Sequence, residues 1–153
     1  ADGRTAGEEV VETANSHGID SRLEDGWLTG DLNKRLASFL GNASGGVTVA
    51  VGEPALQVTR NGAGGRNTHA AVLAARSIAH TNTVFAAFAT DGVDGRSGSA
   101  GGLVDGQTVD RGGDVEPALR AFDSANYLER TKDLIRTGPT GTNVSDLWVL
   151  WKD

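Results

Sequence analysis

The chain has 153 residues, contains no cysteine and carries a formal net charge of −6. This charge argues against partners such as nucleic acid or an anionic membrane, because binding to either requires clustered lysine and arginine. The lack of cysteine excludes disulfides, thiol nucleophiles and thiolate metal sites.

A chain of this length fits one domain, which can bury roughly two-thirds of the surface exposed by the unfolded chain. The longest apolar stretch, Val84–Ala89, is far too short to cross a bilayer. A soluble, cytoplasmic protein is therefore expected. The 22 glycines predict many tight loops, and loops commonly carry binding and catalytic residues.

The first 46 residues predict two helices with a short strand between them. Apolar residues recur at helical spacing over Thr5–Ser16. Ile19–Leu23 alternates as a short strand does, and the Glu-Asp-Gly sequence after it is expected to form a turn. Thr29–Leu40 has one apolar face, with Thr29 or Asp31 as its N-cap and Gly41 just past its end.

The next segment predicts a hairpin and then a glycine-rich loop. Val47–Val51 alternates as a strand, Glu53–Pro54 reads as a turn, and Leu56–Arg60 is expected to be the second strand. Asn61–Asn67 is rich in glycine and leads directly into an alanine-rich helix over Thr68–His80. A loop that leads into a helix start is a typical geometry for an anion site.

Arg66 stands just before this predicted helix. Its planar guanidinium could hold a carboxylate or phosphate by two-point contact, next to the free amides of the helix start. The alternative is an ordinary ion pair between Arg66 and a surface acid. His69 and His80 are expected to be surface or helix-end histidines, since no second ligand stands at metal spacing.

Thr83–Ala89 has the composition of a buried strand, and two aspartates follow it in the sequence Thr-Asp-Gly-Val-Asp-Gly. Asp91 and Asp94 are each followed by glycine, beyond the carboxyl end of a strand. Open sheets commonly bind ligands there, so a hard cation or a hydroxylated substrate is expected. The alternative is a pair of Asx-turns. The spacing does not match an EF-hand.

Strand-like and helix-like segments alternate along the chain, and the expected hairpins require antiparallel strand pairs. The sequence therefore predicts an α/β fold in a single domain, with a mixed sheet flanked by helices. The glycine-rich loops are expected on one edge of that sheet. Five further elements are expected: a small hairpin or turn at Leu103–Val109, a helix at Val115–Phe122, a helix at Ser124–Asp133 capped by its serine, and strands at Leu134–Arg136 and Leu147–Trp151.

The loop between the last two predicted strands, Thr137–Asp146, has the composition of a small anion site. Gly138 and Gly141 can adopt positive φ, and Pro139 fixes its own φ, so the backbone can form a concave turn with its amides pointing inward. Short polar side chains in the loop could bond the anion or the loop itself: Thr137, Thr140, Thr142 and Asn143. The alternative is a decorated hairpin loop.

Three motifs together carry a resemblance to a known family. Gly-Gly-Arg-Asn (Gly64–Asn67), Thr-Asp-Gly-Val-Asp-Gly (Thr90–Gly95) and Thr-Gly-Pro-Thr-Gly-Thr-Asn-Val-Ser-Asp (Thr137–Asp146) resemble the MOFRL domain. This domain is the C-terminal half of the class II glycerate kinases, which are also named hydroxypyruvate reductases. Residues 47–153 are expected to form the MOFRL-like domain, and residues 1–46 to be a helical lead-in similar to the segment that joins the two family domains.

The resemblance implies an activity that needs a second domain. The family phosphorylates glycerate with ATP to give 2-phosphoglycerate, in a cleft between an N-terminal Rossmann-like domain and this one, and Mg²⁺ is expected with the ATP. The implied partners are glycerate or a related small hydroxy acid and the missing N-terminal kinase domain, and a homo-oligomer is possible. The isolated chain is expected to be inactive.

By the same resemblance, Arg66 and Asp91 are the implied catalytic residues, and Asp91 and Asp94 would bind Mg²⁺. The implied substrate-binding residues are Asn67, Asp94, Thr137, Gly138, Thr140, Gly141, Thr142 and Asn143.

The chain departs from the family pattern at Pro54, His69 and Gly98. The alternative function is a stand-alone module of the same fold that binds small anions or regulates. A reductase is the weakest reading, because no Gly-x-Gly-x-x-Gly motif with a following acid is present.

Overall fold

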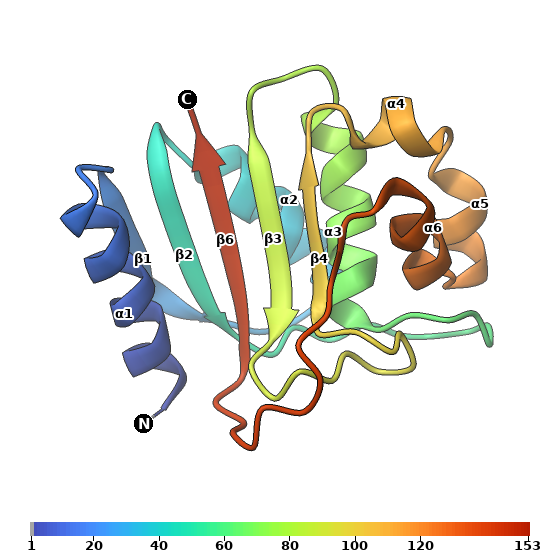
Figure 1. The fold of residues 1–153 in the computed structure, drawn as a ribbon, viewed down its shortest axis with the longest axis horizontal. Coiled ribbons are helices and arrows are strands. Elements are labelled where there is room, and N and C mark those ends of the chain that lie inside the picture. The colour runs from blue at the N-terminus through green and yellow to red at the C-terminus, as the bar shows by residue number, and fades with distance from the viewer. Residues whose placement is uncertain (1) are drawn as a thin grey trace.

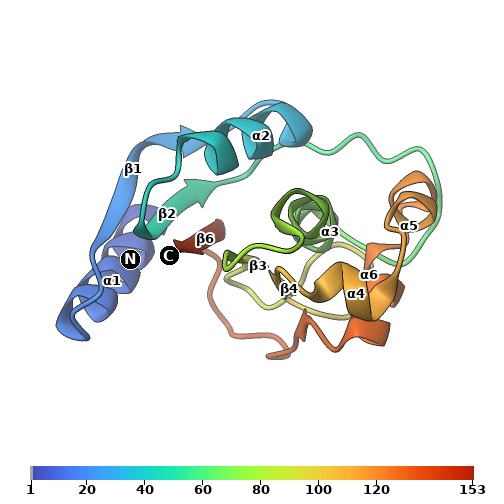
Figure 2. The same cartoon turned by 90° about the horizontal axis from the view of Figure 1, so that it is seen from above.

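The computed structural model describes residues 2–153, and at its centre lies a six-stranded sheet with helices on both faces (Figures 1 and 2). In chain order the elements are α1 (Gly3–Ser16), β1 (Ser21–Leu28), α2 (Leu32–Asn42), β2 (Gly46–Gly52), α3 (Arg66–Ile78), β3 (Val84–Ala89), β4 (Gly101–Asp105), α4 (Thr108–Gly112), α5 (Glu116–Ala121), α6 (Ser124–Thr131), β5 (Leu134–Ile135) and β6 (Asp146–Lys152).

The sheet is mixed, with the strand order β1-β2-β6-β3-β4-β5. Strands β1 and β2 run parallel, and every other neighbouring pair is antiparallel. The predicted α/β domain with a mixed sheet flanked by helices is confirmed.

Helices α2 and α3 lie on one face of the sheet, and α1 lies on the opposite face over β1 and β2 (Figure 2). Phe39 of α2, Phe85 of β3 and Trp148 of β6 fill the core on the first face, where their rings meet edge to face with centroids 5.7 to 6.2 Å apart. Side chains alternate along β2, so Val49 faces α1 from the other side of the sheet. Packed side chains and helices thus cover both faces of the sheet beneath its loops.

Three long loops leave the sheet at the same edge, which is the lower edge in Figure 1. Strands β2 and β3 both run antiparallel to β6, so their carboxyl ends coincide. Strand β5 runs antiparallel to β4, which runs antiparallel to β3, so β5 ends at that edge as well. The prediction that the three glycine-rich loops share one edge is confirmed.

The predicted hairpin of Val47–Val51 with Leu56–Arg60 is wrong. Strand β2 already has β1 on one side and β6 on the other, so no free edge remains for another strand. The segment after β2 forms one isolated bridge, between Asp31 and Ala55, and stays irregular up to the start of α3. This segment is therefore a long loop after β2 and not a strand.

Of the hairpin or turn predicted at Leu103–Val109, the turn is confirmed and the hairpin is wrong. Leu103 pairs with Ala86 of β3, whereas Val109 lies in α4. Asp105 makes the turn between strand and helix, because its Oδ1 accepts the Gln107 amide at 2.8 Å. Likewise, β5 and β6 do not form a hairpin, since β3 and β4 separate them in the sheet.

Near the N-terminus, the predicted turn at residues 24–26 and the predicted helix end before Gly41 are corrected, and the N-cap of α2 is one of its two predicted alternatives. The Glu-Asp-Gly sequence at residues 24–26 lies inside β1, where the register with β2 shifts between Leu23 and Trp27. Asp31, rather than Thr29, caps α2, since its Oδ1 accepts the Lys34 amide at 2.9 Å. The helix continues past Gly41 to Asn42.

Ser124 is the first residue of α6 but does not cap it, because its hydroxyl donates to Thr68 Oγ1 at 2.8 Å. This bond connects α6 to α3.

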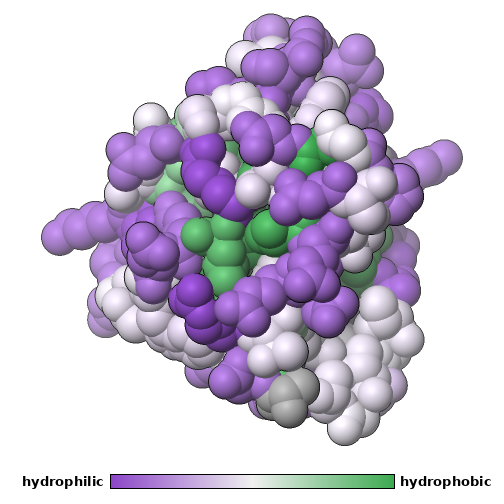
Figure 3. Space-filling model, turned by 90° about the vertical axis from the view of Figure 1, so that its left-hand side faces the viewer, coloured by the Kyte–Doolittle hydropathy of each residue, from purple (hydrophilic) through white to green (hydrophobic). Residues whose placement is uncertain are grey.

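The described residues before Val47 are built into the same sheet as the rest, because β1 pairs with β2 and α1 packs on both. Their predicted similarity to the segment between the two family domains stays a prediction. Seen from the α1 side, most of the surface is polar, and the clearest apolar area lies near its centre (Figure 3). Within residues 2–153 no helix is long and apolar enough to cross a bilayer.

Candidate functional site

The start of α3 is held by a buried carboxylate from the loop after β3. Asp94 is 2% exposed. Its Oδ1 accepts the Asn67 amide at 2.9 Å, and its Oδ2 accepts the Thr68 amide at 2.8 Å. Amides at a helix start have no partner within the helix and favour negative charge. These two amides, predicted to hold an external anion, are therefore taken by the chain's own Asp94.

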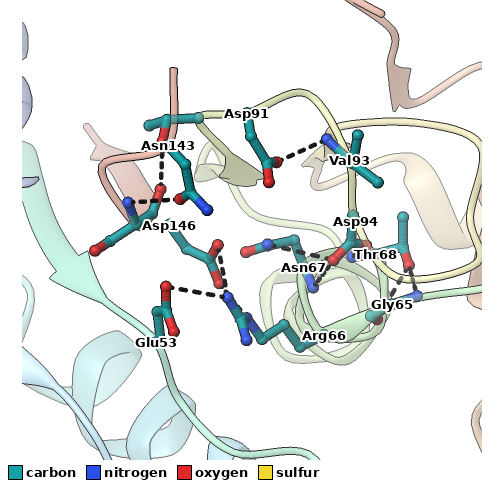
Figure 4. A network of polar contacts seen from close by, with 12 residues as sticks. Glu53, Gly65, Arg66, Asn67, Thr68, Asp91, Val93, Asp94, Asn143 and Asp146 are labelled. Atoms are coloured by element: carbon teal, nitrogen blue, oxygen red, sulfur yellow. Dashed lines mark hydrogen bonds and ion pairs between the residues drawn. The ribbon is translucent and has the colours of Figure 1, made fainter. Parts of the chain in front are cut away.

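Arg66, the first residue of α3, forms a two-point ion pair with Asp146, the first residue of β6 (Figure 4). Arg66 Nε lies 2.5 Å from Asp146 Oδ2, and Nη2 lies 3.2 Å from Oδ1. Glu53 Oε1 lies 3.8 Å from the same Nη2. The Asp146 side chain is 2% exposed and that of Arg66 is 36% exposed. A guanidinium held at two points by a buried carboxylate has a fixed plane, and the rest of it faces the open site.

Burial raises the pKa of the Asp94 and Asp146 carboxyl groups above their usual range. Hydrogen bonds from the start of α3 oppose this effect at Asp94, and Arg66 opposes it at Asp146. The hydrogen bond to Asp146 also raises the pKa of Arg66, which is therefore charged at every physiological pH.

The loops after β3 and β5 are tied together through Thr90. Its hydroxyl donates to the Ser145 carbonyl at 2.7 Å and accepts the Val144 amide at 2.9 Å. Its carbonyl accepts the Thr140 hydroxyl at 2.6 Å, and the Asp91 carbonyl accepts the Thr140 amide at 3.1 Å. The two loops therefore form one hydrogen-bonded unit next to Asp146.

Glycine makes this close contact between the loops possible. Gly92 has φ of +82°, and a Cβ there would lie 2.0 Å from the Gly138 carbonyl oxygen. Gly138 and Gly141 have φ of +66° and +78°, the left-handed conformation predicted for this loop.

A pocket of about 580 Å³ lies between the long loop after β2, the start of α3 and the loop after β3. Arg66, Asn67, Asp94 and Asp146 line one part of it. Other parts carry apolar groups, aromatic rings and two further arginines, namely Leu56, Val58, His69, Phe122, Arg60 and Arg96. The volume lies within the range of small-molecule sites.

Residues 46–146, which make up two-thirds of the chain, match the MOFRL family. The chain belongs to the MOFRL family.

Relatives of this MOFRL chain include glycerate kinases and a putative hydroxypyruvate reductase of Agrobacterium vitis. The chain is 44% identical over 101 residues to D-glycerate 2-kinase of Thermotoga maritima, which covers 63% of this chain and 24% of that protein. It is 41% identical over 92 residues to glycerate 2-kinase of Pyrococcus horikoshii, covering 58% of this chain and 21% of that protein.

The fold is also similar to a crystal structure of glycerate kinase from Thermotoga maritima, with a TM-score of 0.92 and 28% identity. That similarity covers 100% of this chain and 41% of the solved chain. The MOFRL chain thus spans less than half the length of the relatives that it matches.

The structure brings some of the predicted site residues of this MOFRL chain into one pocket wall and leaves others beside it. Arg66, Asn67 and Asp94 line the pocket, whereas Asp91 and the Thr137–Asn143 loop do not. Residues 137–143 are exposed, and Asn143 accepts the Ser145 amide at 3.4 Å. The substrate-binding role of that loop stays a prediction.

The polar residues of the pocket wall that the sequence interpretation missed include Asp146, Arg60, Arg96 and His69. Asp146 was available as a signal, because it ends a polar loop directly before an apolar strand and is a suitable partner for Arg66. Arg60 and Arg96 each adjoin a glycine-rich loop in a chain that is acidic overall, which was also a usable signal. His69 carried no such signal, since its burial depends on the tertiary fold.

Asp94, predicted as a Mg²⁺ ligand, is engaged with the start of α3. Both of its oxygens accept amide hydrogens, and within residues 2–153 no group of three or more His, Cys, Asp or Glu is placed to hold a metal. Asp91 forms an Asx-turn, in which Oδ1 accepts the Val93 amide at 2.9 Å. Its second oxygen has no partner among the described residues. The predicted role of Asp91 and Asp94 as metal ligands stays a prediction.

His69 is buried in this MOFRL chain, so the prediction of a surface or helix-end histidine is wrong for it. It is 5% exposed and stacks on Phe122 with ring centroids 5.2 Å apart. Burial lowers its pKa to about 4. The imidazole is therefore neutral at physiological pH.

His69 is expected to make the free energy of unfolding decrease as the pH falls from about 6.5 to about 4. The unfolded histidine takes up a proton near pH 6.5, whereas the folded one takes it up only near 4. The slope from this one group is at most about 1.4 kcal/mol per pH unit. Urea unfolding at several pH values should show that His69→Gln removes this slope and that the exposed His17→Gln retains it.

The difference between variants is the quantity to measure. Asp94 and Asp146 act with the opposite sign, because a raised carboxyl pKa favours the folded state as the pH falls through it. Equal slopes for His69→Gln and the unsubstituted chain would show that His69 titrates normally.

Proposed function

We propose that this chain is the C-terminal domain of a glycerate 2-kinase, which transfers phosphate from ATP to glycerate and forms 2-phosphoglycerate. The observation that carries the proposal is the Arg66–Asp146 pair, which fixes a charged guanidinium at the pocket. The fold that holds this pair is similar to a glycerate kinase over the whole length of this chain.

Arg66 has the role of holding negative charge on the substrate or on the transferred phosphate. A planar guanidinium matches the two oxygens of a carboxylate or phosphate. Phosphoryl transfer depends on positioned cations and donors around spreading charge rather than on a covalent nucleophile. Asp146 positions Arg66, because the buried two-point pair removes the freedom of a long side chain.

Asn67 supplies a second contact for a hydroxy acid. It is 1% exposed, and its Oδ1 has no hydrogen-bond partner among the described residues although it borders the pocket. Buried polar atoms are nearly always paired, so an unpaired acceptor marks a place for a ligand donor. A hydroxyl group of glycerate provides such a donor, while its carboxylate meets Arg66.

ATP and the remaining groups would come with an N-terminal domain, as the family resemblance implies. The chain spans 24% of the Thermotoga maritima kinase and 21% of the Pyrococcus horikoshii kinase. Asp91 and the Thr137–Asn143 loop, which share hydrogen bonds at the same sheet edge, would complete the wall that faces that domain. Assembly into a homo-oligomer stays a prediction.

Glycerate is expected to bind the chain weakly, with a Kd of about 1 mM or above, because one wall of the cleft is missing and water competes for each donor. An NMR titration with glycerate should shift the amides of Arg66, Asn67 and Asp146. Arg66→Gln should abolish the shifts, whereas Arg22→Gln, on β1 away from the pocket, should not. Equal binding by Arg66→Gln would contradict the assigned role.

A further inference from the structure

The sheet face that carries α1 is covered over only part of its width. Helix α1 packs on β1 and β2. Among residues 2–153, no helix lies in front of β3 and β4 on that side, whereas α3 packs on both strands from the other side (Figures 1 and 2). Strands β3 and β4, and part of β6, therefore have one face without a covering layer.

The strand register identifies the side chains on this face. Val49 of β2 packs towards α1 and pairs with Val149 of β6. Val149 pairs with Ala86 of β3, which pairs with Leu103 of β4. Paired residues point to the same face of a sheet, as do residues two apart along a strand. We call the large apolar residues that this register places on the uncovered face the open strip: Val84, Phe88, Leu103, Ile135, Val149 and Trp151.

The open strip lies on strands that are also apolar on their other face. Strand β3 has the sequence Val-Phe-Ala-Ala-Phe-Ala, and residues 147–151 of β6 are Leu-Trp-Val-Leu-Trp. Strands with one face in water alternate apolar and polar residues, whereas near-continuous apolar runs are typical of strands buried on both faces. Yet Leu103 is 47% exposed and Trp151 is 40% exposed. A contiguous exposed apolar surface of this kind marks an interaction site.

The dimensions of the open strip suit one helix lying beside α1. Neighbouring strands are about 4.8 Å apart, so β6 and β4, with β3 between them, are separated by about 10 Å. This is the diameter of a helix with its side chains. A groove of about 410 Å³ lies between α1 and the strands β2 and β6, with Val10, Ala14, Ile19 and Val149 in its wall. A helix on the open strip would bury this groove and complete the layer that α1 begins.

The free charge beside the open strip is negative. Glu9 lines the groove, and Glu12 is exposed on the same helix. Neither has a basic partner among the described residues. On the other side of the strip, Arg111 and Arg136 are already paired with acids. A helix with lysine or arginine along the side that meets α1 fits this charge.

A domain joined ahead of α1 would start within reach of the open strip. Gly3, the first residue of α1, lies against the loop after β5, because a Cβ on it would be 2.5 Å from the Val144 carbonyl oxygen. The chain spans 41% of the solved glycerate kinase that it matches. The other part of the proposed kinase is therefore long enough to supply one further helix.

We propose that the open strip binds an amphipathic helix with a basic flank, contributed by the N-terminal domain of the complete kinase. The inference rests on the proposed function, because that function supplies the second domain. It goes beyond it, because a domain that faced only the pocket would leave Leu103 and Trp151 in water. A second copy of the chain fits less well, since it would bring another acidic α1 and the net charge of −6 favours the monomer.

The test uses single cysteines, since the chain has none. Leu103→Cys is treated with a thiol reagent in the isolated chain and in the chain fused to the N-terminal domain of Thermotoga maritima D-glycerate 2-kinase. Labelling is expected to be at least about tenfold slower in the fusion, because the docked helix must leave before the reagent reaches the thiol. Ser77→Cys, exposed on α3 at the opposite face, should be labelled at the same rate in both proteins. Peptide mass analysis assigns the label to its cysteine.

Glu9→Lys tests the charge of the helix. In the fusion that carries Leu103→Cys, it should speed labelling by about threefold, because it replaces an attraction by a repulsion at the rim of the groove. Asp25→Lys, which makes the same change of charge on β1 outside the groove, should leave the rate unchanged. Thermal unfolding of the isolated variants should match.

Equal labelling of Leu103→Cys in the isolated chain and in the fusion overturns the proposal. Slow labelling in the isolated chain, together with a dimer in analytical ultracentrifugation, also overturns it, because a second copy then covers the open strip. A fusion that forms product from ATP and glycerate but leaves Leu103→Cys unprotected refutes only this inference. A fusion that protects Leu103→Cys but forms no product supports this inference and counts against the proposed function.

Discussion

Replacing Arg66 with alanine is expected to lower kcat/KM for glycerate by about a hundredfold or more in the complete two-domain enzyme. The substitution removes the guanidinium that would hold the substrate carboxylate or the transferred phosphate. It also leaves Asp146 buried without its partner. Arg66→Lys retains a charge but loses the fork, so it should recover only part of the rate. Steady-state assays with ATP and glycerate measure both variants.

Stability has to be measured beside the rate, because a buried carboxylate without a partner is costly. Thermal unfolding of each variant shows whether the loss of rate reflects the site or the fold. Arg22→Ala is the matched control, because Arg22 lies on β1 and does not line the pocket. If the complete protein phosphorylates glycerate and Arg66→Ala leaves the rate unchanged, the site assignment is wrong even though membership of the MOFRL family stands.

Asp91 offers a comparison within the same variant set. If it orients the glycerate hydroxyls or a metal ion, Asp91→Ala should also cost on the order of a hundredfold. Asp94 lies three residues further on but caps α3 from a buried position. Its replacement should therefore lower stability first, which separates the two aspartates experimentally.

The sequence predicted most elements where the signal is local. Val47–Val51 and Thr83–Ala89 became strands β2 and β3, because their β-branched and apolar residues suit a buried sheet. The hairpin after β2 failed for a nonlocal reason: β6, from the end of the chain, occupies the position between β2 and β3. No periodicity within residues 47–60 reveals that this edge is already taken.

The candidate site divides in the same way. Arg66 could be predicted, because a glycine-rich loop before a helix is a local pattern. Its partner Asp146 lies 80 residues later and meets it only through the strand order. The role of Asp94 depends on the loop after β3 folding back onto the start of α3. The burial of His69 depends on Phe122 at the end of α5.

The isolated chain is expected to show no glycerate phosphorylation, and activity is expected to appear when an N-terminal kinase domain is joined to it. The reason is geometric, since in the proposed function the chain would supply one wall of a cleft, and it spans 41% of the length of a solved glycerate kinase. Phosphoryl transfer requires ATP and substrate to be held in line, which a single wall does not achieve.

The most direct measurement is ATP-dependent formation of 2-phosphoglycerate by the chain alone and by the chain fused to the N-terminal domain of Thermotoga maritima D-glycerate 2-kinase. The same N-terminal domain with its own C-terminal domain serves as the positive control. We expect no product from the chain alone and product from the fusion. Turnover by the chain alone would contradict the account, and so would a folded, glycerate-binding fusion that forms no product while the control does.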